Sequence, residues 1–154
     1  MPGVAEAWTP ARTEPPRHYF EDVKVGVPLE TPAFTVTQTH LALFGGLVGD
    51  QAAAADPVVP DLLPLCISSG LTWRLPTAPL AVLAFVGFEW RFLLPVHVGD
   101  TIRSRTWTTT KRSVREGGIV IEGREILNQR GQVVQAGKIT LLVAKRPPEG
   151  AARA

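Results

Sequence analysis

Two aspartates, Asp50 and Asp61, have the residue type and setting that acid-base chemistry needs. Asp50 ends a glycine-rich segment, and Asp61 follows Pro60 at the start of an apolar stretch. If both carboxyl groups face one pocket, their mutual repulsion keeps one of them protonated, so that a proton donor lies beside a proton acceptor. Such a pair can transfer protons without a histidine. The alternative interpretation is structural, with Asp50 as a turn residue and Asp61 as a helix cap.

The other reactive side chains predict neither a nucleophile nor a metal site. No two of the three histidines, His18, His40 and His97, share a helical face or a spacing typical of metal ligands. Cys66 is the only cysteine and stands in an apolar run, so we expect a buried structural thiol. The sequence therefore predicts no metal and no cofactor.

The elements that must position the aspartates begin with a strand and a first helix. Thr37 or Thr39 can cap that helix over about 40–48, because a hydroxyl oxygen accepts a bond from a free amide of the first turn. Gly49, Pro57 and Pro60 then favour an irregular crossing toward a second helix.

The second helix is predicted over about 62–73, with Asp61 as its cap and Pro64 in its first turn. It is apolar nearly all round, which is typical of a buried helix. Four strand segments follow it and are separated by turns that contain glycine; they cover about 80–92, 101–111, 118–127 and 132–145. This order predicts an α+β fold in which an antiparallel sheet wraps around one central buried helix.

Composition places the chain among ordinary globular domains. Its 154 residues are 45% hydrophobic and 19% charged, which suits one domain with a real core. A net charge of +2 with scattered basic residues does not indicate a nucleic-acid surface, and no segment approaches the roughly 20 apolar residues of a membrane span. We expect a cytoplasmic protein. Residues 1–17 and 147–154 are predicted to be disordered tails, and 18–146 a single domain.

The region from about residue 19 to 146 resembles the MaoC-like, (R)-specific enoyl-CoA hydratase family. The motifs that carry the resemblance are Tyr19-Phe20-Glu21-Asp22 with Val25-Gly26, Phe34-Thr35-Val36-Thr37, Phe44-Gly45-Gly46-Leu47-Val48-Gly49-Asp50, Ser69-Gly70-Leu71, Trp90-Arg91-Phe92, Pro95-Val96, Gly99-Asp100-Thr101 and Asn128-Gln129-Arg130-Gly131. Their order and spacing imply the hot-dog fold of that family. The function must still be argued from the site.

The resemblance also shows which parts of the family's active site are missing. The family's pattern implies an Asp, an Asn and a His, and here Asp50 is kept while Ala52 and Ala55 replace the Asn and the His. In the family, the Asp and His position and deprotonate water, while an amide at the start of the central helix polarises the thioester carbonyl. That helix start carries Pro60-Asp61 here in place of the usual His-Gly pair.

We therefore expect Asp50 and Asp61 as catalytic residues, with Asp61 open to the alternative of a helix cap. The expected substrate-binding residues are Gln51 and Phe44 in the same segment, and Trp73 and Arg74 at the end of the central helix. A large ring and a guanidinium could reshape a thioester tunnel for a rigid or acidic substrate. Structural roles remain open for both, with the arginine favoured by the helix dipole and the tryptophan filling the concave face of the sheet.

Three functions follow as hypotheses. The first is an enzyme that dehydrates, isomerises or cyclises an acyl or polyketide-like thioester, carried by coenzyme A or a carrier protein, or a cyclic product derived from one. The second is a non-catalytic hot-dog subunit that partners an active hydratase, and the third is a module that binds an apolar ligand. We expect a homodimer, or a heterodimer with a similar chain, because pairing would cover a long sheet edge.

Overall fold

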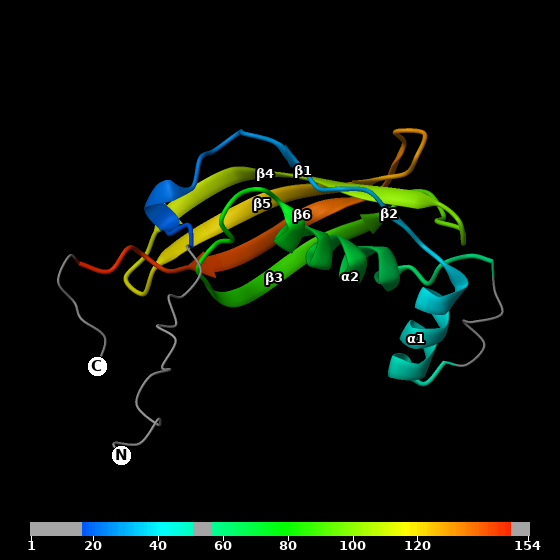
Figure 1. Ribbon diagram of the computed structural model, residues 1–154. Helices are drawn as coiled ribbons and strands as arrows, with labels where there is room; N and C mark the ends of the chain where they lie inside the picture. Colours follow the sequence, from blue (N-terminus) through cyan, green and yellow to red (C-terminus); the bar gives the residue numbers. More distant parts are fainter. Residues whose placement is uncertain (1–16, 51–56, 149–154) are drawn as a thin grey trace, which may run out of the picture.

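The computed structural model describes residues 17–50 and 57–148, which form one curved sheet with one helix along its concave face (Figure 1). The helices and strands, in chain order, are η1 (Phe20–Asp22), β1 (Leu29–Glu30), β2 (Phe34–Thr35), α1 (Gln38–Val48), α2 (Leu62–Leu71), η3 (Thr72–Arg74), β3 (Val82–Phe92), β4 (Thr101–Ser113), β5 (Gly118–Leu127) and β6 (Val133–Val143). The predicted tails lie almost wholly outside the described residues, so their disorder stays a prediction.

The sheet is antiparallel throughout and has the order β1-β4-β5-β6-β3, with β2 also pairing with β4. The long strands follow the predicted segments closely, and β5 begins and ends where expected. The hairpin turn after β5 has Gly131 at φ 75°, which a residue with a side chain adopts only with strain. The predicted α+β class is therefore confirmed.

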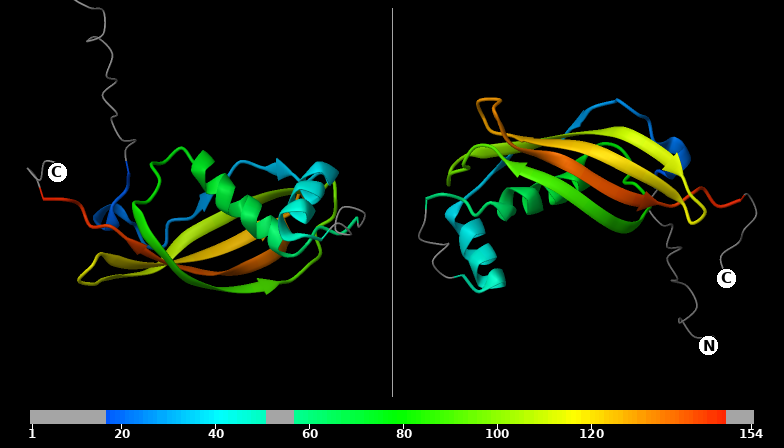
Figure 2. Two further views of the ribbon diagram at one scale, coloured as in Figure 1. Left: turned by 90° about the horizontal axis from the view of Figure 1, so that it is seen from below. Right: turned by 180° about the vertical axis from the view of Figure 1, so that it is seen from behind.

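Hydrogen bonding shows which face of the sheet lies under the central helix. Ser68 of α2 donates from its Oγ to Oγ of Ser104 on β4 at 3.0 Å, and both residues are buried. Since side chains alternate along a strand, Thr106 shares this concave face with Ser104. Figure 2 shows α2 lying across the concave side of the curved sheet.

The hydrophobic core fills the space between the sheet and the elements before and after α2. One cluster of buried residues lies around the first half of α2; it comprises Val36, Leu41, Val59, Leu63, Val96, Ile102, Ile126 and Val134. A second cluster lies toward the other end of the sheet, where Phe20 of η1 packs against it; it comprises Val23, Val120, Ile139, Leu141 and Val143.

The first helix has the predicted position and begins slightly earlier. The Thr37 backbone N–H donates to Nδ1 of His40 at 2.9 Å, so the histidine satisfies the backbone at the helix start. The helix ends at Gly49, whose φ of 78° lies in the left-handed region typical of a helix C-terminus.

The expectation that α2 is buried all round is wrong. Its inner face is buried, but Leu62 is 51% exposed and Cys66 is exposed as well. The reason is that one sheet covers only one side of a helix, so the apolar outer side of α2 faces outward. The prediction that the Cys66 thiol is buried is therefore also wrong.

No helix in the described ranges combines the length and apolarity that a membrane crossing needs.

Candidate functional site

Asp50 directly follows the C-terminal cap of α1 and is exposed. Its backbone N–H donates to the Gly45 carbonyl oxygen at 2.9 Å, so the helix end holds its backbone in place. Gln51, Ala52 and Ala55 lie outside the described residues. The predicted roles of Asp50 and Gln51 in catalysis and binding therefore stay predictions.

Asp61 is placed directly before α2 as predicted, but its side chain makes no cap hydrogen bond. Its φ and ψ of −54° and −36° are already helical, whereas a capping residue is normally extended. The Pro60 carbonyl accepts the Leu63 N–H at 2.9 Å and so occupies a first-turn amide without help from the carboxylate. The prediction of Asp61 as a helix cap is thus wrong, and its exposed carboxylate has no partner among the described residues.

The two aspartates follow and precede different helices, and the helices diverge. Figure 1 shows α1 running away from the sheet, whereas α2 lies along its concave face. Neither aspartate lines the two hollows described below. Their convergence on one pocket stays a prediction.

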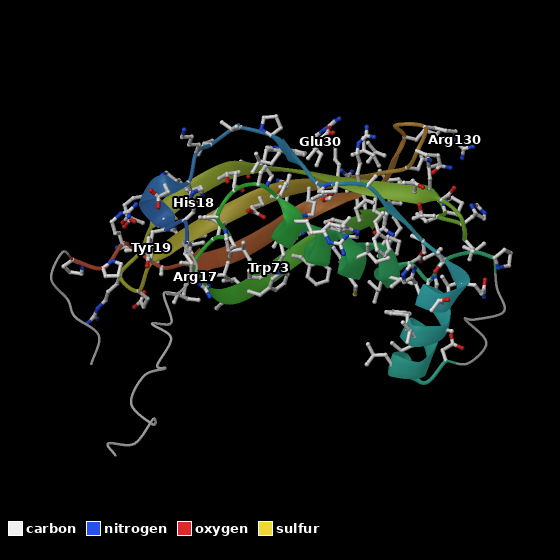
Figure 3. The ribbon with its side chains drawn as sticks, viewed as in Figure 1. Arg17, His18, Tyr19, Glu30, Trp73 and Arg130 are labelled. Carbon is white, nitrogen blue, oxygen red and sulfur yellow. The ribbon has the colours of Figure 1, made fainter. Side chains whose placement is uncertain are left out.

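Of the described residues predicted to bind substrate, Phe44 lies apart from Trp73 and Arg74. Trp73 and Arg74 belong to η3, and both are exposed, with 69% of Trp73 accessible. They lie at the end of the molecule where the chain near His18 pairs with the segment that follows η3 (Figure 3). The alternative role of Trp73, to fill the concave face, is therefore wrong. Phe44 on α1 is half-buried and packs against the first core cluster.

A hydrogen-bonded pair that the sequence did not indicate connects the start of α2 to the sheet. Gln135 of β6 is buried and donates from Nε2 to the Asp61 backbone oxygen at 2.8 Å. Its Oε1 accepts from Trp90 Nε1 at 3.0 Å. Gln135 therefore fixes the position of Asp61 above the concave face. The available signal was an amide at a position of β6 whose alternate neighbours, such as Ile139 and Leu141, are apolar.

A second residue missed from sequence is Arg124, whose residue surface is only 6% exposed. It pairs in register with Thr106 on β4, so it lies on the concave face beneath α2. Its Nη2 is 3.2 Å from Oε2 of Glu122, the next residue on the same face of β5. Burial lowers the pKa of the Arg124 guanidinium, and the nearby Glu122 carboxylate opposes that change.

Two shallow hollows of about 390 and 520 Å³ lie on the opposite, convex face. They share Glu89, Thr109 and Lys138, and Trp107 forms part of the wall of the larger one. Trp107 alternates with Thr106 along β4 and so faces away from α2. These hollows lie on the face of the sheet away from α2, neither aspartate lines them, and we assign them no role in the chemistry.

Comparisons with known proteins agree with the fold. No family model matches the sequence, and no curated protein matches it. Among solved structures, the monoamine oxidase regulatory protein from Archaeoglobus fulgidus is 29% identical, with a TM-score of 0.76 over 85% of this chain and 97% of that chain. The MaoC-like dehydratase from Rhodospirillum rubrum is 22% identical, with a TM-score of 0.68 over 84% of this chain and 99% of that one.

Two further solved structures extend the comparison. The (R)-hydratase PhaJ1 from Pseudomonas aeruginosa is 19% identical, with a TM-score of 0.68 over 87% of this chain and 96% of that chain. A Mycobacterium tuberculosis protein with a double hot-dog fold is 20% identical, with a TM-score of 0.69 over 88% of this chain and 47% of that one. The structural neighbours are thus MaoC-like dehydratases and (R)-hydratases, and this chain has the hot-dog fold.

Proposed function

We propose that this protein is a divergent enzyme of the dehydratase and hydratase type that acts on an acyl or polyketide-like thioester. The observation that carries the proposal is the exposed carboxylate of Asp61, which stands at the start of the central helix without serving as its cap. A charged group in that position, without a structural partner among residues 17–50 and 57–148, is available to a ligand. Asp50, retained in the segment that resembles the family's active site, supplies the second carboxyl group.

The proposed chemistry is proton transfer by this pair. In a dehydration, the ionised carboxylate removes a proton from the carbon beside the thioester carbonyl, and the protonated partner gives its proton to the departing hydroxyl group, which leaves as water. Isomerisation and ring closure need the same two transfers at other atoms. Substrate binding is proposed for Phe44, Gln51, Trp73 and Arg74, with the thioester carried by coenzyme A or a carrier protein.

We further propose that the protein is a dimer, formed with a second copy or with a similar chain. Strand β3 is an edge of the sheet, and its side chains are unusually apolar and exposed; the large ones are Val82, Leu83, Phe85, Val86, Phe88 and Phe92, with exposed fractions between 42% and 59%. An open apolar edge strand favours pairing with another chain.

The test of the proposed chemistry compares Asp50→Asn with Asp61→Asn on a panel of 3-hydroxyacyl and enoyl thioesters. Asparagine keeps the shape of the carboxyl group but cannot exchange its proton, so each variant should fold normally and bind thioester as the wild type does. Turnover should fall by roughly a hundredfold or more in each. Asp22→Asn, an exchange in η1 at the far end of the fold, is the matched control and should retain turnover.

The outcomes separate the three hypotheses. Full turnover in both variants would remove the aspartates from the chemistry. If the wild type binds thioesters without converting any of them, the non-catalytic subunit or the binding module is the better account. If Asp50→Asn lowers the melting temperature and leaves turnover unchanged, Asp50 has a structural role in its loop.

A further inference from the structure

Arg124 is a charged group in the part of the fold where charge is most costly. It lies on the concave face of β5 between Thr106 and Gly137, its cross-strand neighbours, and its side chain is 7% exposed. Removing a guanidinium from water carries a large penalty unless its donors are satisfied. A purely structural core would be served as well by an apolar residue of similar volume.

The hydrogen-bonding capacity of Arg124 is only partly used. A guanidinium has five N–H donors, and to the residues that the structure describes Arg124 makes one contact, from Nη2 to Glu122 at 3.2 Å. Its Nε is buried and has no hydrogen-bond partner among the described residues. Buried donors are nearly always paired, so an unpaired one indicates a missing acceptor.

The surroundings connect Arg124 to the proposed site. The ring of Trp90 fills the space above Gly137, the direct neighbour of Arg124, because a Cβ on that glycine would collide with the ring. The same ring donates to Gln135, which holds the Asp61 backbone. Gln135 and Gly137 are successive residues on one face of β6, so Arg124 lies within about 10 Å of the contact under Asp61.

The concave face is open along β3 on either side of the Trp90 ring. Phe88 and Phe92 pair with the buried residues Ile139 and Gln135 and so lie on this face, yet they are 52% and 47% exposed. The helix α2 therefore covers the part of the concave face that lies beneath it, and the strip along β3 is left uncovered. An extended apolar chain can lie along this strip.

We propose that Arg124 is a specificity-determining residue that donates a hydrogen bond from its guanidinium to an oxygen on the acyl chain of the substrate. This inference rests on the proposed function, because it assumes that the thioester end lies near Asp61. The substrate class is then an acyl thioester with an oxo group along its chain, as opposed to a plain aliphatic acyl group.

The charge balance favours a ketone oxygen over a second carboxylate. Glu122 already neutralises Arg124, so a further carboxylate would leave a net negative charge in a desolvated place. A carbonyl oxygen accepts the unused N–H without adding charge. A plain alkyl chain leaves the donor unpaired, which costs affinity.

The experiment measures the binding of saturated acyl-CoA thioesters of equal length. One has a plain chain, and each compound of a matched series has one ketone at a different position along the chain. Isothermal titration should show that the wild type binds the best oxo compound at least about tenfold more tightly. Arg124→Met should abolish this preference while it retains affinity for the plain thioester. Arg105→Met removes an arginine from the convex face of the neighbouring strand and should leave the preference intact.

Folding is controlled by a second variant. Because a lone charge in the core is destabilising, the double variant Glu122→Leu with Arg124→Met removes the pair together and should fold. It too should bind both thioesters equally. Equal binding by the wild type, or a preference that survives Arg124→Met, would overturn this inference and leave the proposed function standing. If neither thioester binds the wild type, the proposed function falls and this inference falls with it.

Discussion

At the scale of single residues, two aspartates near turns behave in opposite ways. Asp100 has its two carboxylate oxygens occupied, one by the His97 backbone N–H at 2.8 Å and the other by Gln129 Nε2 at 2.7 Å. The Asp61 carboxylate makes neither kind of contact with the part of the chain that the structure describes. The first carboxylate therefore stabilises the fold, and the described contacts give the second no such role.

The stabilising role of Asp100 predicts a pH dependence. Burial of Asp100 raises its pKa, but hydrogen bonds from His97 and Gln129 outweigh burial, and the net pKa is lowered. A lowered folded-state pKa gives stability that is present above the unfolded value, near 3.9, and is lost as the pH falls through the folded-state pKa. Asp100→Asn should cost about 1 kcal/mol in urea unfolding at pH 7, allowing for solvent screening.

That cost should shrink as the pH falls below about 4, because the unfolded carboxyl is protonated first and the folded wild-type carboxyl only below its lowered pKa. Glu116→Gln, in an exposed turn, is the matched control and should change little at any pH. A cost for Asp100→Asn that does not vary with pH would mean that shape, and not charge, matters at this position.

The missing catalytic residues make a prediction about activity. Because Ala52 and Ala55 replace the Asn and His that the resembling family pattern implies, hydration of crotonyl-CoA should be at least about a hundredfold slower than in a complete member. The measurement is the loss of absorbance of the enoyl thioester with both proteins under one condition. Comparable rates would show that this chain does not need the missing Asn and His for hydration.

At the scale of elements, the glycines of the sheet and of the helix have opposite roles. A Cβ at Gly137 would collide with the Glu89 backbone oxygen and the Trp90 ring, where β3 and β6 pair. Gly137→Ala should therefore destabilise the protein by about 1–3 kcal/mol, measured by urea unfolding, because neither neighbour can yield without disturbing the strand pairing.

The matched exchange is Gly46→Ala in the last turn of α1. A Cβ there meets nothing within 4 Å. Alanine is the better helix former, so this variant should be more stable by about 0.5–1 kcal/mol. If both exchanges have the same sign, the close approach of β3 and β6 is not what requires glycine at position 137.

At the scale of the whole molecule, the apolar β3 edge predicts assembly. Val86→Lys introduces a charge where a second chain would pair, and it should shift the protein from dimer toward monomer in light scattering at micromolar concentration. Val86 is 58% exposed, so the folded single chain should tolerate the exchange. Val27→Lys, at 50% exposure near β1, is the control and should leave the dimer intact.

A wild-type protein that is a monomer at that concentration would contradict the dimer. A dimer unaffected by Val86→Lys would move the interface to another surface, such as the exposed apolar side of α2.

The sequence by itself determined the elements and their class. Gly118–Leu127 was predicted at both ends because the alternation of side chains and the turn glycines are local signals. The first helix and the antiparallel sheet followed for the same reason. The resemblance of scattered motifs added the hot-dog fold, which the solved structures support.

Only the tertiary structure decided which side chains meet. Arg124 and Gln135 lie under α2 because of the strand register, and register depends on pairing between distant segments. Asp61 is not a cap because the Pro60 carbonyl takes the Leu63 amide, a choice that the residue types alone do not reveal. The exposed outer side of α2 likewise depends on how much one sheet can cover. Long-range packing, which local patterns do not encode, therefore positions the residues of the candidate site.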